Sequence, residues 1–308
     1  MPPSLPTFSI ITPSFNHVHF IEAAIDSVLS QNYPALEYLV MDAASTDGTV
    51  DLLRKYDSRL QWISQPDRGQ TDAINRGFAQ TSGEILGWLN SDDQYAPGAL
   101  AAVGEFFSAH PNIGVVYGNA DFIDARGNRI GRCAHIEPFN PHRLLHYSDY
   151  IVQPAAFFRR SVFDAAGGLD PSLHWAMDYD FWLKASRLTQ FAFLPRVLAH
   201  YRWLDSSKTS VGGDDRLTEV ERVARRHGAS GLPAYFRLEA VRMHVKQAAS
   251  HLRRREFSAA FRCSFAAAGS LVSSPRAVRS LFSIRTWRII WMGQVIRRAA
   301  KSHPTKSE

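Results

Sequence analysis

Residues 84–93 join a short apolar run to a pair of carboxylates, and this stretch constrains the rest of the chain. Ile85 to Leu89 form a run of the length expected for a buried strand, and Asp92 and Asp93 follow it closely. In an open α/β sheet, ligands bind in the crevice outside the carboxyl ends of the strands. The sequence therefore predicts a ligand site at Asp92 and Asp93.

Two adjacent carboxylates repel one another unless a cation lies between them or one of them is protonated. The pair is therefore typical of ligands for a hard divalent cation, Mg²⁺ or Mn²⁺. Such a cation usually keeps several waters and binds one or two carboxylates together with substrate phosphates. The alternative is a turn followed by a helix cap, because Asp is common at both and Pro97 and Gly98 come next.

Strand and helix patterns alternate through the first half of the chain. Short apolar stretches predict strands at 8–12, 36–41, 60–64, 85–89 and 114–117, and helical spacing predicts helices at 21–29, 49–56, 73–82 and 97–110. Residues 121–130 resemble a hairpin, residues 191–203 a last strand region, and residues 136–152 give no clear pattern. The alternation predicts an α/β fold with a mostly parallel sheet.

The last third of the chain is helical in pattern and basic. Helices are predicted at 232–252, 256–271 and 276–300, so we expect domains at 1–215 and 216–302 and a disordered tail at 303–308. From His251 onward ten Arg and two Lys stand against two Glu, whereas the whole chain carries +6. Because the basic character belongs to these helices, nucleic-acid binding by the whole protein is not supported. The helix at 276–300 either lies on an anionic membrane surface or packs with a solvated Arg face.

The compartment is predicted from cysteine usage and hydropathy. Cys133 and Cys263 lie far apart, with no metal-binding or redox spacing. The chain opens with no secretory signal pattern, and no uncharged apolar run approaches the ~20 residues of a membrane span. We expect a cytoplasmic protein whose basic helices attach it peripherally to the inner face of a membrane.

Several stretches, in this order, resemble the motifs of the inverting glycosyltransferases of family 2. They are residues 11–16, 40–49, 90–93 and 177–183, together with the spacing of Gly69, Ala73, Asn75, Gly77, Gly83 and Glu84. The resemblance covers roughly residues 8–203. It implies the GT-A fold, a Rossmann-like, mostly parallel central sheet with helices on both faces, followed here by a C-terminal helical appendage.

The resemblance also implies roles for individual residues. Pro13 and Phe15 would contact the nucleotide, Asp42 the base and Asp92 the ribose or uridine, and Asp93 would bind the metal. Arg68, in the loop before the third predicted helix, is either a further nucleotide contact or a surface charge.

Asp178 opens a predicted helix, where a carboxylate suits either a cap or a general base. The resemblance assigns it as the general base. Met177 stands where the family has Glu, so the assignment rests on register, with Asp180 as the alternative.

The implied activity is that of a metal-dependent hexosyltransferase of the EC 2.4 class. It would move one sugar from a nucleotide-diphosphate sugar, expected to be a UDP-sugar, to a lipid-linked or saccharide acceptor in surface polysaccharide or glycolipid assembly. The alternative is a catalytically inactive nucleotide- or carbohydrate-binding module. A dehydrogenase and a P-loop enzyme are disfavoured, because neither G-x-G-x-x-G nor a P-loop lysine motif is present.

Overall fold

The computed structural model describes residues 5–133 and 136–272. The predicted helix at 276–300 and the predicted tail at 303–308 lie outside the described residues. The strands are β1 (Phe8–Ser14), β2 (Leu36–Asp42), β3 (Gln61–Ser64), β4 (Ile85–Trp88), β5 (Gln94–Tyr95), β6 (Ile113–Ile123), β7 (Arg129–Arg132), β8 (Ala156–Arg159) and β9 (Gln190–Arg202). The helices are α1 (Val18–Leu29), α2 (Thr49–Arg54), α3 (Gln70–Ala79), α4 (Ala99–Ala109), α5 (Pro141–His146), η1 (Gln153–Ala155), α6 (Arg160–Ala165), α7 (Met177–Ala185), α8 (Lys208–Val211), α9 (Gly213–Arg226), α10 (Ala234–Arg253) and α11 (Phe257–Val272).

The strands form one mixed sheet in the order β3-β2-β1-β4-β8-β6-β9-β5, with β7 paired to β6. The first four strands of this order are parallel, so their carboxyl ends meet at one edge. Ser14, the last residue of β1, pairs with Asp42, the last residue of β2. The predicted mostly parallel α/β sheet is confirmed, and the first strands end where a ligand site is expected.

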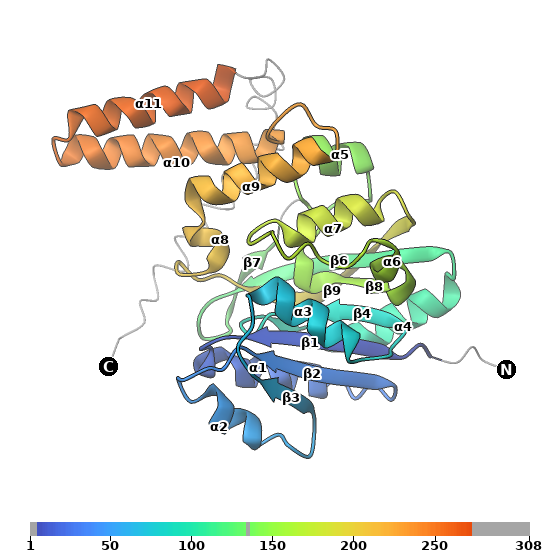
Figure 1. Cartoon of the computed structure of the whole chain (residues 1–308). Helices are drawn as coiled ribbons and strands as arrows, with labels where there is room; N and C mark the ends of the chain where they lie inside the picture. Colours follow the sequence, from blue (N-terminus) through green and yellow to red (C-terminus); the bar gives the residue numbers. More distant parts are fainter. Residues whose placement is uncertain (1–4, 134–135, 273–308) are drawn as a thin grey trace. The chain divides into compact units, whose positions relative to one another are not determined.

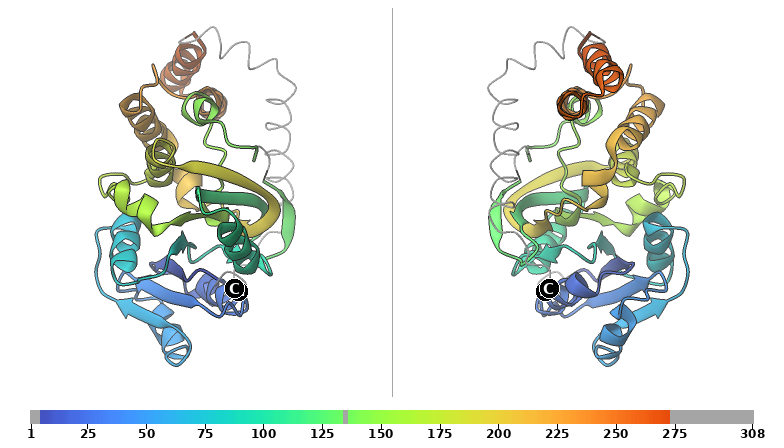
Figure 2. Two further views of the ribbon diagram at one scale, coloured as in Figure 1. Left: turned by 90° about the vertical axis from the view of Figure 1, so that its right-hand side faces the viewer. Right: turned by 90° about the vertical axis from the view of Figure 1, so that its left-hand side faces the viewer.

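Helices cover both faces of this sheet, as predicted (Figures 1 and 2). Helices α1, α2 and α4 pack on one face through apolar side chains such as Ile25, Leu53 and Val103. On the other face, α3, α6 and α7 join an aromatic cluster. Within it the rings of Trp88 and Trp182 are stacked, with centroids 6.0 Å apart. Since Trp88 ends β4 and Trp182 belongs to α7, this contact fixes α7 against the strand that leads to Asp92 and Asp93.

In the second half of the sheet, one long strand lies where a strand region was predicted, and one short strand was not predicted. The strand region predicted at 191–203 corresponds to one long strand, β9 (Gln190–Arg202), although Pro195 interrupts its apolar pattern. The register with β6 shifts between Gly118 and Ala120, opposite the segment that contains Pro195. A bulge tolerates proline because the ladder already lacks a hydrogen bond there. The short strand β5, directly after Asp93, pairs with the end of β9 and was not predicted.

The chain divides into two compact units. One holds the sheet with α1 to α4, α6 and α7, and the other holds Asn140–Asp149 and the helices that follow Leu204. Within the second unit, the backbone N–H of Tyr235 donates to the carbonyl of Tyr147 at 2.8 Å, and Arg216 pairs with Glu239 at 2.6 Å. The helices predicted at 232–252 and 256–271 are confirmed as α10 and α11. In residues 5–133 and 136–272, no helix is both long and apolar enough to cross a membrane.

Candidate active site

Asp93 lies at the carboxyl end of β4 and is almost fully buried, with 1% of its surface exposed. Its Oδ1 accepts the backbone N–H of Arg202 at 2.9 Å, and its Oδ2 accepts the side-chain amide of Asn90 at 3.3 Å. Burial, together with the charge of Asp92, raises the pKa of Asp93 well above its usual value. Burial also raises the pKa of Asp92, although His17 and Arg202 oppose this. The pair therefore favours a proton or a cation beside it.

The donor set fits a hard divalent cation that is held by few protein ligands. No group of three or more His, Cys, Asp or Glu side chains with metal-binding geometry occurs among the described residues. Mg²⁺ and Mn²⁺ sites of this kind use one or two carboxylates, with waters and substrate phosphates completing the coordination. Asp93 and Asp92 are the residues that would hold such a cation.

A chain of side-chain amides fixes the turn that carries the carboxylates. Gln70, at the start of α3, donates to Asn90 Oδ1 at 2.7 Å, and Asn90 Nδ2 donates to Gln153 Oε1 at 3.2 Å. Gln153 Nε2 in turn donates to the carbonyl of Trp88 at 2.7 Å. Every link is a neutral hydrogen bond in a largely buried site, so the chain orients Asn90 toward Asp93.

Arg202, the last residue of β9, is the main residue of this site that the sequence did not indicate. Its side chain is buried, and its guanidinium donates to the carbonyls of Asp92 at 2.7 Å, Asp124 at 2.6 Å and Ala125 at 3.0 Å. The guanidinium carbon also lies 5.1 Å from the ring centroid of Phe20. Arg202 thus joins the acidic turn to the β6–β7 turn and places a positive charge beside the two carboxylates. A charged residue ending an apolar strand was its only sequence signal.

Replacing Arg202 with methionine is expected to lower the free energy of unfolding by about 3 kcal/mol. Methionine has a similar length but no donors, so the carbonyls of Asp92, Asp124 and Ala125 all lose the hydrogen bonds that the guanidinium donates. Urea unfolding followed by tryptophan fluorescence measures the change. Arg126→Met is the matched control, because Arg126 is exposed in the adjacent turn. Equal unfolding of the two variants would show that the guanidinium contacts contribute nothing to stability.

The predicted nucleotide-side residues lie at the ends of β1 and β2. Pro13 is buried in β1, whereas Phe15 follows the strand with 59% of its surface exposed. Asp42 is buried, and its carboxylate accepts Ser45 N–H at 3.0 Å, Ser45 Oγ–H at 2.5 Å and Ser64 Oγ–H at 2.6 Å. The structure therefore brings Pro13, Phe15 and Asp42 together at neighbouring strand ends.

Arg68 makes its contacts with other residues than Pro13, Phe15 and Asp42. Its side chain is 82% exposed and pairs with Asp72 at 2.9 Å, at the start of α3. Asp72 also lies 3.6 Å from Arg76. These contacts are those of a surface ion pair, which is one of the two alternatives for Arg68.

Asp178 lies in the first turn of α7 and is half-buried. Side chains of α3 fix the segment before it: Asn75 exchanges hydrogen bonds with the backbone of Leu169 at 2.8 and 3.0 Å. Thr71 Oγ1 lies 3.1 Å from the carbonyl of Leu173 and 2.9 Å from the sulfur of Met177. Helix α3, whose first residue contacts Asn90, therefore also holds the chain that enters α7.

The two candidate bases of α7 have different surroundings. Asp180 is fully buried, and its carboxylate pairs with Lys184 at 2.8 Å. Asp178 is partly open to solvent. A base must reach the hydroxyl proton that it abstracts. Accessibility therefore favours Asp178 over Asp180.

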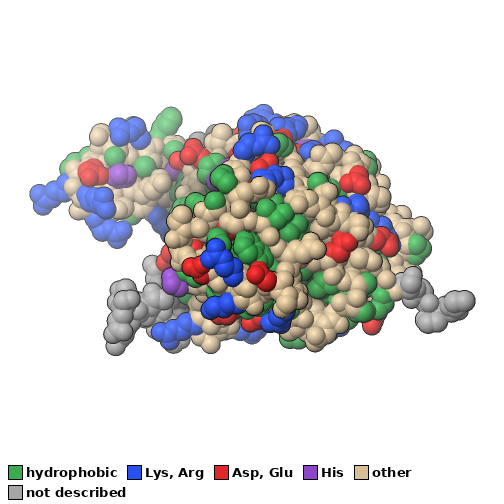
Figure 3. All heavy atoms as spheres, turned by 60° about the horizontal axis from the view of Figure 1, so that its bottom comes forward, with side chains coloured by type: hydrophobic (Ala, Val, Ile, Leu, Met, Phe, Trp, Pro, Cys, Tyr) green, Lys and Arg blue, Asp and Glu red, His purple; other side chains and the backbone are tan. Residues whose placement is uncertain are grey.

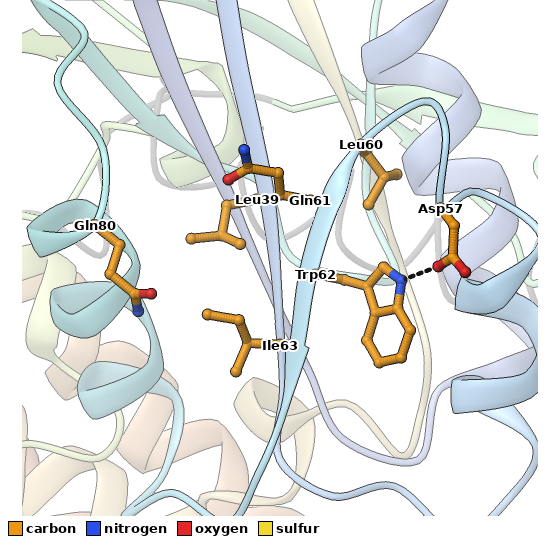
Figure 4. Close-up of a pocket in the computed structure, with 7 residues that line it drawn as sticks. All are labelled: Leu39, Asp57, Leu60, Gln61, Trp62, Ile63 and Gln80. Atoms are coloured by element: carbon orange, nitrogen blue, oxygen red, sulfur yellow. Dashed lines mark hydrogen bonds between the residues drawn. The ribbon is translucent and has the colours of Figure 1, made fainter.

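An open hollow of about 490 Å³ lies beside the edge strand β3 (Figure 4). It is lined by Leu39, Asp57, Leu60, Gln61, Trp62, Ile63 and Gln80. Trp62 Nε1 donates to Asp57 Oδ1 at 2.7 Å on one side of the strand, whereas Ile63 and Gln80 lie on the other. None of the predicted site residues lines this hollow.

The mixed sheet, with ligand-type residues at its parallel strand ends, defines a GT-A-like fold. Residues 1–349 of Staphylococcus aureus TarS, solved with UDP-GlcNAc, match with a TM-score of 0.62 and 18% identity, over 96% of this chain and 91% of that one. The mannosyltransferase PcManGT of Pyrobaculum calidifontis, solved with GDP-Man and Mn²⁺, matches with a TM-score of 0.54 and 19% identity, over 100% and 89%. At these identities the likeness establishes the fold.

Sequence comparison identifies the family. Residues 9–167 match "Glycosyl transferase family 2". An uncharacterized glycosyltransferase of Mycobacterium tuberculosis is 30% identical over 228 residues, which are 73% of this chain and 84% of the relative. The O-antigen biosynthesis protein RfbC of Myxococcus xanthus is 31% identical over 223 residues, 70% of this chain and 17% of that protein. The chain belongs to glycosyl transferase family 2, and the resemblance inferred from its motifs is confirmed.

Proposed function

We propose that this protein is an inverting, metal-dependent glycosyltransferase that moves one hexosyl unit from a nucleotide-diphosphate sugar to an acceptor hydroxyl. The observation that carries the proposal is the carboxylate pair that follows β4, the buried Asp93 and the half-buried Asp92, in a sheet whose neighbouring strands end at Ser14 and Asp42. Family membership supports a nucleotide-sugar donor. The transfer chemistry then belongs to the unit that holds the sheet.

The reaction needs a place for the negative charge that develops on the departing nucleoside diphosphate. A divalent cation supplies that charge stabilisation when bound. Asp93, with Asp92 beside it, would hold the cation, and the buried Arg202 adds a fixed positive charge to the same turn. The backbone contact from Arg202 and the amide of Asn90 fix the Asp93 carboxylate, so little reorganisation is needed.

The acceptor side needs one base. As the acceptor oxygen bonds to the anomeric carbon, its proton passes to the carboxylate of Asp178 and the bond from that carbon to the diphosphate oxygen breaks. Attack from the face opposite the leaving group inverts the anomeric configuration. A single displacement of this kind requires no protein nucleophile. The half-buried position of Asp178 at the start of α7 supports this role.

The donor and acceptor are proposed at the level of chemical class. TarS was solved with UDP-GlcNAc and PcManGT with GDP-Man, so proteins with this fold accommodate either base. We propose a UDP-sugar as donor and a saccharide or lipid-linked acceptor. The O-antigen biosynthesis protein among the relatives supports a setting in surface polysaccharide or glycolipid assembly.

Calorimetric titration with UDP, GDP, UDP-GlcNAc and GDP-Man, each with and without Mn²⁺, tests this function. We expect one nucleotide class to bind at least tenfold more tightly with Mn²⁺, and we expect slow donor hydrolysis in the same samples. Equal binding without the metal would overturn the metal assignment. Because Met177 stands where related motifs have Glu, an inactive binding module is the second candidate; metal-dependent binding without turnover of any bound donor would favour it.

A further inference from the structure

Helices α10 and α11 form a hairpin, which we call the helical arm (Figure 1). The turn between them is made by residues 254–256. Arg255 has a φ of 60°, and the backbone N–H of Glu256 donates to the carbonyl of His251 at 2.9 Å. The arm therefore ends in a defined reversal of the chain, and three consecutive arginines, 253–255, lie at that end.

Among the side chains of α11 that the structure describes, the three phenylalanines are exposed, whereas two alanines are buried. Phe257, Phe261 and Phe265 are 67%, 72% and 74% exposed. Residues four apart lie on one face of a helix, so the three rings form one stripe. By contrast, Ala260 and Ala267 are buried, at 3% and 6%. Packing within the arm therefore uses alanines, and it leaves the phenylalanines as an unpartnered aromatic face.

Basic residues border this stripe. Arg253, Arg254, Arg255 and Arg262 are all exposed. From Arg253 to Val272 these four arginines stand against one acid, Glu256, whose carboxylate lies 2.5 Å from the ring nitrogen of His251. Lys and Arg side chains gather at the end of the arm where α10 passes into α11 (Figure 3). Leu252, 53% exposed, adds apolar surface at the same end.

We propose that this face of the arm is a docking surface for an anionic phospholipid bilayer. Helices that lie in a membrane interface combine an aromatic or aliphatic stripe with Lys and Arg beside it. The rings of Phe257, Phe261 and Phe265 enter the boundary between headgroups and acyl chains, and the arginines contact lipid phosphates. Since an anionic leaflet attracts each basic residue near its surface, the charge and the stripe act on the same target.

The positive charge beside the phenylalanine stripe favours an anionic lipid surface over the other partners that could cover this face. A second copy of this chain would bring four more arginines against the same face, and this repulsion is unfavourable near a stripe with one acid. An anionic bilayer supplies the opposite charge over a wide area and accepts the rings without a preformed groove. The predicted basic helix at 276–300 has the same arginine-rich character, so it is a poor electrostatic match for this face.

Co-sedimentation of the full-length protein with vesicles tests this inference, which does not depend on the catalytic proposal. We expect binding to vesicles of equal parts phosphatidylglycerol and phosphatidylcholine, and at least tenfold weaker binding to phosphatidylcholine alone. The triple variant Phe257→Ser, Phe261→Ser, Phe265→Ser should bind the mixed vesicles about tenfold more weakly than wild type. Because all three rings are exposed, circular dichroism should show an unchanged helix content.

The matched control replaces two exposed apolar residues elsewhere, Leu188→Ser and Val211→Ser, which are 50% and 65% exposed in wild type. This variant should bind vesicles as wild type does. Unchanged vesicle binding by the triple phenylalanine variant would overturn the proposal. So would light scattering that shows a wild-type dimer and a monomeric triple variant, because the stripe would then be an interface between copies.

Discussion

Replacing Asp93 with asparagine is expected to reduce sugar transfer by about a thousandfold or more and to leave a folded protein. The carboxylate is the proposed cation ligand, and the amide keeps its shape but not its charge. In the absence of metal, folding should not suffer. Burial and the charge of Asp92 raise the pKa of Asp93, so ionisation of this buried carboxyl opposes folding near neutral pH. Asparagine removes that cost.

Thermal unfolding distinguishes loss of the cation ligand in Asp93→Asn from a general folding defect. Ligand binding to the folded state raises stability by RT ln(1 + [L]/Kd), or about 2.7 kcal/mol at a hundredfold excess over Kd. Mn²⁺ with nucleotide should therefore raise the Tm of wild type and leave that of Asp93→Asn unchanged. Asp164→Asn, at an exposed carboxylate of α6, is the control and should behave as wild type. An equal Tm increase in Asp93→Asn would refute the metal assignment.

The parallel half of the sheet could be predicted because its strands are buried on both faces. Such strands appear in the sequence as short uninterrupted apolar runs, and β1, β2 and β4 were located by this signal. The sequence predicts a last strand region at 191–203, and only the bulge against β6 explains how one strand, β9, includes Pro195. The apolar pattern of a segment carries no information about its register with a partner strand that is distant in the sequence.

The acidic pair of the site could be predicted, but its support could not. Asp92 and Asp93 follow an apolar strand, so their place at the sheet edge follows from chain order. Arg202 contacts the same turn although it lies more than a hundred positions later in the sequence, and its hydrogen-bond partners are backbone carbonyls. A carbonyl has no side-chain identity, so no sequence motif marks such a contact. The amide chain through Gln70, Asn90 and Gln153 is hidden for a related reason, because its members come from three separate segments.

Replacing Asp178 with asparagine is expected to lower the rate of transfer about a thousandfold while donor affinity stays within twofold of wild type. A general base acts on the acceptor proton, so its loss slows the chemical step but leaves nucleotide contacts in place. Asparagine cannot take up that proton, yet it keeps the shape of the side chain at the start of α7. Single-turnover transfer from the bound donor measures the rate, and calorimetry with nucleotide and Mn²⁺ measures affinity.

The Asp180→Asn variant tests which of the two carboxylates in this helix turn is the general base. Asp180 is fully buried and pairs with Lys184, so its replacement leaves an ammonium group without its carboxylate and should lower stability. The fraction that remains folded should transfer sugar at close to the wild-type rate, because a buried and paired carboxylate does not meet the acceptor. The reverse outcome, with transfer lost in Asp180→Asn and retained in Asp178→Asn, would assign the base to Asp180. If Asp180→Asn loses stability but keeps the rate of transfer, and Asp178→Asn loses the rate but keeps stability, then Asp180 is the structural carboxylate and Asp178 the catalytic one.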